Sequence, residues 1–243
     1  MTAAARRWQD QQTMAPPIPL AVRRGVLWSA DLDRSQGEEL AARVPVEFRQ
    51  IQREALPQLL AAAGQMDPIP PEALVRRFEL GRQCYAAWVD GALAAYGWLT
   101  RGREWVGEFE RELNIPDGDA YIWDCATLPA RRRQRLFSAL LGHVTGQLAR
   151  EGVRRLWIIS VITAPAMNRG VMDAGFEPIL RLVYLHLHSK RALLTIPVPG
   201  GPPQKISEAR GLFDGPDEHR LGPLIVGNSR RPRPPETHID LDS

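Results

Sequence analysis

The stretch "CATLPARRRQRLFSALLGHV", residues 125–144, decides the fold. An apolar, strand-like run ends at Leu128-Pro129, and from residue 136 onward apolar side chains recur with the spacing of a helix. Four arginines stand between the two: Arg131, Arg132, Arg133 and Arg135. Because the dipole of a helix is already positive at its N-terminus, cations there are unfavourable unless they surround an anion. The order of strand, arginines and helix therefore predicts an anion site, with a solvated helix start as the alternative.

The segments on either side of this stretch predict a single mixed sheet. Strands are expected over 22–33, 46–52, 84–100, 104–113, 119–128, 154–162 and 179–189, and helices over 53–64, 70–81, 136–150 and 165–174. The first strand is a candidate edge strand. Asp90-Gly91 divides 84–100 into two β-rich runs, as in a hairpin with a type I′ turn. This order predicts the α/β (α+β) class, with a strand–helix–strand unit in the second half.

Composition divides the chain into three regions. Residues 1–19 are rich in Ala, Gln and Pro and are expected to be disordered. Residues 20–196 are expected to form the folded domain. Residues 197–243 hold nine of the 21 prolines and few periodic apolar runs, so this tail is expected to be disordered or loosely attached.

Charge and cysteine content exclude several classes of protein. The net charge is only +3 and the arginines are clustered, which favours local anion sites over a uniformly basic nucleic-acid-binding protein. Nucleic-acid binding through 131–135 and 230–233 is the weaker alternative, because no aromatic platform accompanies these arginines. Two cysteines are fewer than a secreted scaffold needs, so a cytoplasmic location is expected. The sequence contains no run of 18 apolar residues, so no membrane span is predicted.

Residues 46–188 resemble the GNAT superfamily of N-acyltransferases. The acyl-CoA loop of that family reads Arg/Gln-x-x-Gly-x-Gly/Ala between a strand and a long helix, and Arg132 matches its first position. The sequence "MDAGF", residues 172–176, matches the turn that leads into the last strands of the family, and the hairpin at 84–100 matches its central meander. The resemblance implies a GNAT-like mixed, mostly antiparallel sheet flanked by helices.

The resemblance also implies acetyl-CoA as a cosubstrate. The loop 131–137 would hold the pyrophosphate, and backbone groups around Leu128 would bind the pantetheine arm and the thioester oxygen. The amine acceptor would lie over 96–110 and 121–125. The residues that this resemblance brings to the cosubstrate are Thr127, Leu128, Arg132, Arg133, Gln134, Arg135, Leu136, Phe137 and Asn168.

The chain departs from the family pattern at four positions. Arg135 and Phe137 stand where the loop usually has its two glycines. Ala164 stands where many members of the family have an Asn, and Val171 stands where many have a Tyr that donates a proton to the leaving thiolate. Asn168 is close to the Asn position in sequence but out of register. These departures leave open a second function, a GNAT-like domain without catalysis that serves as a binding or regulatory module.

Acyl transfer to an amine needs a group that removes a proton and a group that supplies one. Asp124, an acid within an apolar strand, is the candidate base, with Glu108 and Glu110 as further candidates. Tyr184 is the candidate acid. The alternative for each carboxylate is a surface or structural role, and for Tyr184 it is a place in the core.

Two other constellations are weaker signals. His186 and His188 share one face of a strand, but no third ligand is evident, so no metal site is predicted. Cys125 has no evident base beside it, and a buried thiol is therefore favoured over a nucleophile.

The resemblance thus implies an acyl-CoA-dependent N-acyltransferase, specifically an N-acetyltransferase, in which an amine attacks the thioester directly. The acceptor is a small-molecule or peptide amine that the sequence does not identify. The long strand 179–189 leaves a homodimer open, because it could pair with the edge of a second subunit.

Overall fold

The computed structural model describes residues 21–32, 40–65, 69–187, 190–214, 219–221 and 223–228. Its strands are β1 (Ala21–Asp31), β2 (Glu47–Ile51), β3 (Gln83–Val89), β4 (Ala92–Thr100), β5 (Arg103–Val106), β6 (Arg111–Asn114), β7 (Asp119–Thr127), β8 (Arg155–Val161), β9 (Glu177–Leu187), β10 (Lys190–Pro197), β11 (His219–Leu221) and β12 (Leu224–Asn228). Its helices are α2 (Leu56–Ala63), α3 (Pro71–Glu79), α4 (Leu136–Arg150), α5 (Pro165–Asp173) and α6 (Pro203–Gly211), with short 3₁₀ turns at Arg53–Ala55 and Pro129–Arg131.

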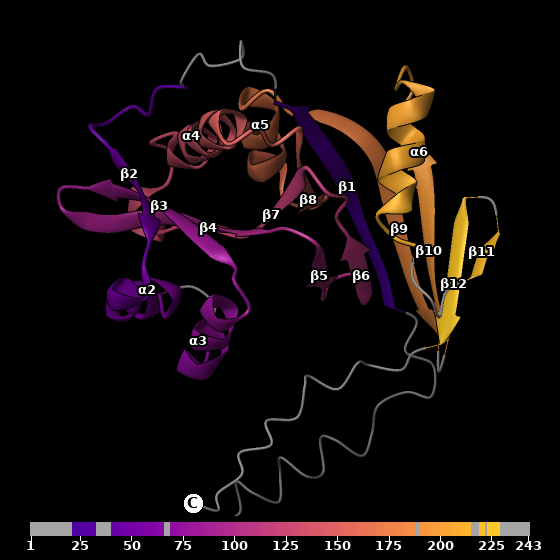
Figure 1. Ribbon diagram of the computed structural model, residues 1–243, viewed down its shortest axis with the longest axis horizontal. Helices are drawn as coiled ribbons and strands as arrows, with labels where there is room; N and C mark the ends of the chain where they lie inside the picture. The colour runs from indigo at the N-terminus through magenta and orange to yellow at the C-terminus, as the bar shows by residue number, and fades with distance from the viewer. Residues whose placement is uncertain are drawn as a thin grey trace, which may run out of the picture.

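Within these residues one sheet of ten strands has the order β11-β12-β10-β9-β1-β8-β7-β4-β3-β2, and β5 and β6 form a separate hairpin (Figure 1). Neighbours in the large sheet are antiparallel except β7 and β8, which are parallel. The predicted class, a mixed and mostly antiparallel sheet flanked by helices, is confirmed. The hairpin between β3 and β4 is also confirmed, since Asp90 and Gly91 have φ values of 53° and 73°, as a type I′ turn requires.

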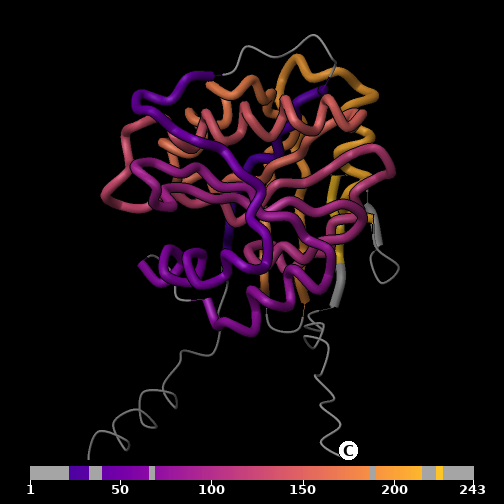
Figure 2. Tube along the Cα trace, turned by 60° about the vertical axis from the view of Figure 1, so that its left-hand side comes forward, coloured from indigo at the N-terminus to yellow at the C-terminus, as the bar shows by residue number. Residues whose placement is uncertain are grey.

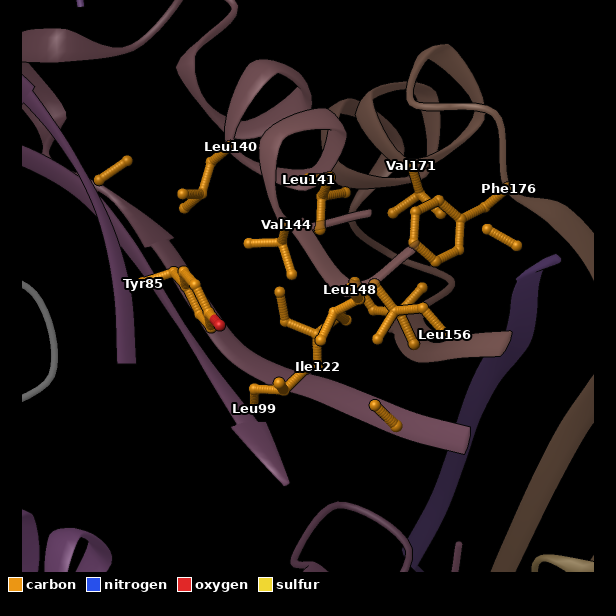
Figure 3. Close-up of a cluster of buried hydrophobic side chains, with 14 of the residues drawn as sticks. Tyr85, Leu99, Ile122, Leu140, Leu141, Val144, Leu148, Leu156, Val171 and Phe176 are labelled. Atoms are coloured by element: carbon orange, nitrogen blue, oxygen red, sulfur yellow. The ribbon is translucent and has the colours of Figure 1, made fainter. Parts of the chain in front are cut away.

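Helices cover both faces of the sheet (Figures 1 and 2). On one face α4 contributes Leu140, Leu141, Val144 and Leu148 to a core that also contains Ile122, Leu156, Val171 and Phe176, all buried (Figure 3). On the other face α2 and α3 pack against β3 and β4 through Leu59, Leu74 and Trp98. A third cluster joins α6 and the β5–β6 hairpin to β9 and β10. The α4 helix is therefore fixed along its length, and its N-terminus has a defined place beside β7.

The expectation of an edge strand at 22–33 is wrong, because β1 lies inside the sheet between β8 and β9. Residues 25–30 are buried on both faces, with Trp28 in one core and Leu27 in another, while residues 22–24 and Asp31 are exposed. Gly25 is required where β1 passes the β5–β6 hairpin: a Cβ there would lie 2.6 Å from Phe109 Cζ and 2.8 Å from the Ser160 carbonyl oxygen.

The strand expected over 104–113 is a hairpin instead. The chain turns over 107–110, and Glu110 adopts a left-handed φ of 46°. Apolar residues occur in both short strands and in the turn, at Trp105, Val106, Phe109 and Leu113, which explains why the segment resembles one strand. As a result, Glu108 and Glu110 lie in the turn rather than in a strand.

Part of the tail that was expected to be disordered from residue 197 onward is folded in the structure. Helix α6 is followed by fully buried Leu212 and Phe213, and β12 pairs with β10 and buries Ile225. Few apolar residues occur here, but they lie in the core, so a composition average does not reveal them. Residues 1–20 and 229–243, which include most of the remaining segments expected to be disordered, lie outside the described residues.

Ion pairs attach α6 to the ends of β1 and β8. Arg155 donates to Asp31 at 2.6 Å and to Glu208 of α6, and Lys205 of α6 contacts Asp31 at 2.8 Å. The hydrogen bond from Arg155 holds the pKa of Glu208 below its ordinary value, against the opposing effect of burial. The helix is therefore held by charge as well as by its apolar contacts.

Candidate active site

The parallel strands β7 and β8 separate partway along their length. They pair from Asp119 with Arg155 to Ile122 with Ile158, and beyond this point no pairing joins them. Strand β7 also bulges at Asp124, which has φ 44°, where the register against β4 shifts. Gly97 of β4 admits this bulge, since a Cβ there would lie 2.9 Å from Cys125 Sγ. The two strands thus leave an opening in which the β8-facing edge of β7 is unpaired.

A groove with a volume of about 1350 Å³ lies between the loop 127–138 and α5. Six arginines line it: Arg43, Arg131, Arg132, Arg133, Arg135 and Arg169. Asp173 is the one carboxylate among the described lining residues, and it lies 3.8 Å from Arg135. Arg131 is paired with Asp90 at 3.0 Å. Excess positive charge over a groove of this size suits a ligand with several phosphates.

The backbone of the loop beside this groove has an unusual conformation at two positions. Arg133 and Arg135 are both left-handed, with φ values of 66° and 60°. Where the resembled loop has its first glycine, Arg135 thus adopts a conformation that favours glycine, at a cost of about 1–3 kcal/mol. In the part of the chain that the structure describes, no backbone oxygen accepts from the N–H groups of 133–138. These N–H groups and the helix dipole favour an anion there.

The second missing glycine is compensated on the neighbouring helix. The ring of Phe137 packs against Gly170 of α5, where a Cβ would lie 2.6 Å from Phe137 Cδ1. Both residues line the groove. The bulk of Phe137 is therefore accommodated by α5.

This contact gives a prediction for stability. Gly170→Ala is expected to lower the free energy of unfolding by about 1–3 kcal/mol, because the added methyl group overlaps the ring. Phe137→Leu in the same chain should restore most of the loss. Urea denaturation of the two single variants and the double variant measures this coupling. Full stability of Gly170→Ala alone would contradict the close contact.

A second pocket, of about 430 Å³, adjoins the groove. Cys125 and Met167 line both cavities. Its walls come from α3, the β5–β6 hairpin, β7, β8 and α5, and include residues of both segments expected to hold the acceptor. Its aromatic residues are Trp105, Phe109, Tyr121 and Trp123, and its charged residues are Arg77, Glu104, Glu108 and Asp124.

Asp124 enters this pocket with a fixed orientation. Arg77 of α3 donates to its carboxylate, and the guanidinium lies 4.5 Å from the ring of Trp123 and 5.1 Å from that of Trp98. Helix α3 was predicted from its prolines and terminal glycine, but nothing in the sequence pattern indicated that Arg77 would reach β7.

The two glutamates of the pocket have different environments. Glu104 is buried and accepts from Arg82 at 2.6 and 3.0 Å, from the Thr100 hydroxyl and from the Trp105 N–H, so its charge is fully compensated. Glu108 is exposed on the turn of the β5–β6 hairpin. Arg23 donates to the carbonyls of Gly107 and Glu108 at 3.0 and 2.9 Å, which fixes that turn.

Four of the predicted site residues line neither cavity: Tyr184, Asn168, Leu128 and Gln134. Tyr184 is fully buried beneath Phe109, and burial followed by the nearby Glu110 carboxylate raises the pKa of Tyr184 to about 12. Asn168 accepts from the Ser160 hydroxyl at 2.6 Å, and Ser160 in turn accepts from Trp28 Nε1 at 2.8 Å. Asn168 thus connects α5 to the sheet, and Tyr184 belongs to the core.

The role expected for Leu128 is also corrected. Its backbone N–H donates to the Ala94 carbonyl at 2.9 Å, and its own carbonyl accepts from Arg131 N–H at 2.9 Å. Leu128 can therefore give neither its N–H nor an uncommitted carbonyl to a cosubstrate. Thr127 and Leu136 line the groove, while the Gln134 carbonyl accepts from Arg43 N–H at 3.0 Å and so fixes the loop.

Neither a cysteine nucleophile nor a metal site is added by the other reactive side chains among the described residues. Burial raises the pKa of the Cys125 thiol well above its usual range, which opposes a nucleophilic role. Across the described residues no three His, Cys, Asp or Glu side chains are placed to hold a metal ion, and His188 lies outside them. None of the helices described is long and apolar enough to cross a membrane.

Most of the region that forms the groove and the second pocket falls within a match to a known protein family. A sequence profile of the acetyltransferase (GNAT) family matches residues 47–172, which is more than half of the chain. The chain belongs to the GNAT acetyltransferase family. The GNAT match includes the arginine loop, the bulged strand β7 and most of α5. Comparison with curated protein sequences found no match.

Solved GNAT structures share the fold at low sequence identity. A GNAT-family acetyltransferase from Colwellia psychrerythraea is 14% identical, with a TM-score of 0.51 over 76% of this chain and 62% of that one. The GCN5-related glucosamine N-acetyltransferase region of a fungal multi-domain GH3 β-N-acetylglucosaminidase is also 14% identical, with a TM-score of 0.52 over 76% of this chain and 23% of that one. This chain therefore spans less than two thirds of either protein, and the likeness concerns the fold alone.

Proposed function

We propose that this GNAT protein is an acyl-CoA-dependent N-acyltransferase that moves an acetyl group from acetyl-CoA to a primary amine. One observation carries the proposal: the arginine-lined groove and the acidic, aromatic pocket meet at Cys125 and Met167, beside the opening between β7 and β8. A donor with phosphates and an acceptor with an ammonium group would thus be held on two sides of one point. The free Cys84 and Cys125 are consistent with a cytoplasmic location.

Acetyl-CoA would occupy the larger cavity. Its phosphates would contact the arginines and the N–H groups of 133–138, and this anion would offset the repulsion between the arginines and the helix dipole. The pantetheine amides would pair with the unpaired edge of β7 beside β8. The thioester would then lie near Cys125 and Met167.

The reaction needs the amine in its neutral form. Asp124, which points into the acceptor pocket, would accept the proton of the ammonium group. The amine nitrogen would attack the thioester carbonyl carbon, so that a C–N bond forms and the C–S bond breaks. CoA would leave as a thiolate and take up one proton, giving the N-acetylamine and free CoA.

The second candidate function is acyl-CoA binding without turnover. The observation that favours it is the position of the tyrosines. Val171 replaces the usual tyrosine and is fully buried, and Tyr184 lies in the core. Tyr121 lines the acceptor pocket, but burial raises the pKa of its hydroxyl well above the usual range. Protonation of the leaving thiolate would then depend on solvent or on the proton released by the amine.

Calorimetric titration with acetyl-CoA and with CoA tests the donor site. We expect roughly micromolar binding, weakened about tenfold or more by Arg132→Ala or Arg135→Ala, because each removes charged hydrogen bonds to phosphate. Arg150→Ala, at the exposed end of the same helix, is the matched control and should bind as the unaltered chain does. Absence of binding by the folded protein would overturn the proposal. Binding without turnover on a panel of amines would support the second candidate.

A further inference from the structure

We infer that the acceptor is a small primary amine with an apolar, aromatic body and no carboxylate group. This inference rests on the proposed function and names the substrate class of its second pocket. The evidence is the charge, the wall chemistry and the commitment of Arg77 in that pocket.

The charge of the pocket favours a cation. Glu104 is neutralised by Arg82, which leaves Asp124, Glu108 and one arginine, Arg77, facing the cavity. Arg77 and Asp124 form an ion pair, so the exposed carboxylate of Glu108 gives the pocket a net negative charge. An ammonium group is attracted there, and a carboxylate on the acceptor is repelled.

The only cation that lines this pocket in the described residues is already committed. Arg77 donates to Asp124, its guanidinium lies over Trp123 and Trp98, and its side chain is only 19% exposed. Binding an acceptor carboxylate would require Arg77 to leave both the ion pair and the rings. Amino acids and peptide C-termini are therefore poor acceptors for this geometry.

The walls of the pocket favour an apolar body. Trp105, Phe109 and Trp123 supply aromatic surface, Ile159 adds aliphatic surface, and Met167 lies on the side next to the groove. A volume of about 430 Å³ suits a small molecule rather than a folded protein segment. The faces of these aromatic rings also attract an ammonium group.

The geometry also fixes the direction in which such an amine would lie. Asp124 and Cys125 are consecutive in β7, and Cys125 lines both cavities. The ammonium group would therefore lie at the Asp124 end, next to the thioester, and the body would extend toward the β5–β6 hairpin. Arg23 and the close contact between Gly25 and Phe109 hold this hairpin in place, so the pocket is formed before the acceptor arrives.

Three probes of graded chemistry test the inference on the full chain. Phenethylamine, phenylalanine and ethylamine are titrated calorimetrically into the protein loaded with CoA, and the CoA affinity is recorded in the same series. We expect phenethylamine to bind at least about tenfold more tightly than phenylalanine, because the added carboxylate is repelled. Ethylamine should also bind about tenfold more weakly, because it leaves the aromatic walls uncovered.

A matched pair of variants assigns the charge effect to the pocket. Glu108→Gln is expected to weaken phenethylamine binding, but only about threefold, because the charge of the exposed Glu108 is partly screened by solvent. The variant should also bind phenethylamine and phenylalanine with more similar affinities than the unaltered chain does. Glu112→Gln changes an exposed carboxylate on β6 that lines neither cavity. This variant should bind phenethylamine and phenylalanine with the affinities of the unaltered chain.

The outcomes separate this inference from the proposed function. If CoA binds but either phenylalanine or ethylamine binds as tightly as phenethylamine, the assignment of the acceptor class is overturned while the donor site stands. If CoA binds and none of the three probes does, the assignment is overturned in the same way. If phenethylamine binds selectively but CoA does not bind, the amine pocket is supported and the acyltransferase proposal is overturned.

Discussion

Replacing Asp124 with asparagine is expected to lower kcat about 10²- to 10³-fold, because the amide has the shape of the carboxylate but cannot accept the ammonium proton. Its side-chain oxygen can still accept from Arg77, so the bulge at residue 124 should persist. The release of CoA thiol with phenethylamine and acetyl-CoA measures kcat. Calorimetry should give an unchanged affinity for CoA, since Asp124 does not line the groove.

The control for this substitution is Asp117→Asn. Asp117 lies in an exposed turn before β7 and lines neither cavity, so the rate should not change. An unchanged kcat in the Asp124→Asn variant would contradict the role of Asp124 and transfer it to Glu108 or to solvent. Reduced CoA affinity would instead mean that the substitution distorts β7.

Trp157→Ala is expected to lower the free energy of unfolding by about 3–5 kcal/mol, the largest stability effect that the structure predicts. Trp157 is fully buried in β8, its Nε1 donates to Asp119 Oδ2 at 2.8 Å, and Arg155 lies 5.0 Å from its ring. Truncation would leave a cavity where β7 and β8 still pair, and would remove one donor from the buried carboxylate of Asp119. Urea denaturation measures the loss.

Trp157→Phe separates the two contributions. It keeps most of the buried ring but removes the hydrogen bond to Asp119, and should cost about 1–3 kcal/mol. Equal losses for the alanine and phenylalanine variants would show that the hydrogen bond, and not the volume, dominates. A loss below about 1 kcal/mol for Trp157→Ala would contradict close packing at this position.

Periodicity and turn chemistry were enough to predict most elements near the groove. The helix at 136–150 and the strand at 119–128 depend on local patterns, and so does the Asp90-Gly91 turn. The place of β1 within the sheet could not be predicted in this way, because it depends on pairing with β8 and β9, which follow more than a hundred residues later.

Among the cationic residues of the candidate site, those that were predicted are contiguous in the chain. The loop from Arg131 to Phe137 was identified because one stretch contains the strand end, the charges and the helix start. Arg43, Arg77 and Arg169 reach the two cavities from separate segments of the chain, and no sequence spacing relates them to the loop. Leu128 fails as a donor for a similar reason, since its N–H is taken by Ala94 of another strand.

The contact between Phe137 and Gly170 has a consequence for the divergence of related sequences. Each residue limits the volume that the other may occupy, although 33 positions separate them in the chain. In related sequences that share an ancestor, substitutions at these two positions should therefore occur together. A bulky residue in the loop should be accompanied by glycine on α5. A search that requires glycine in the loop would overlook such lineages, whereas a search for the coupled pair would recover them.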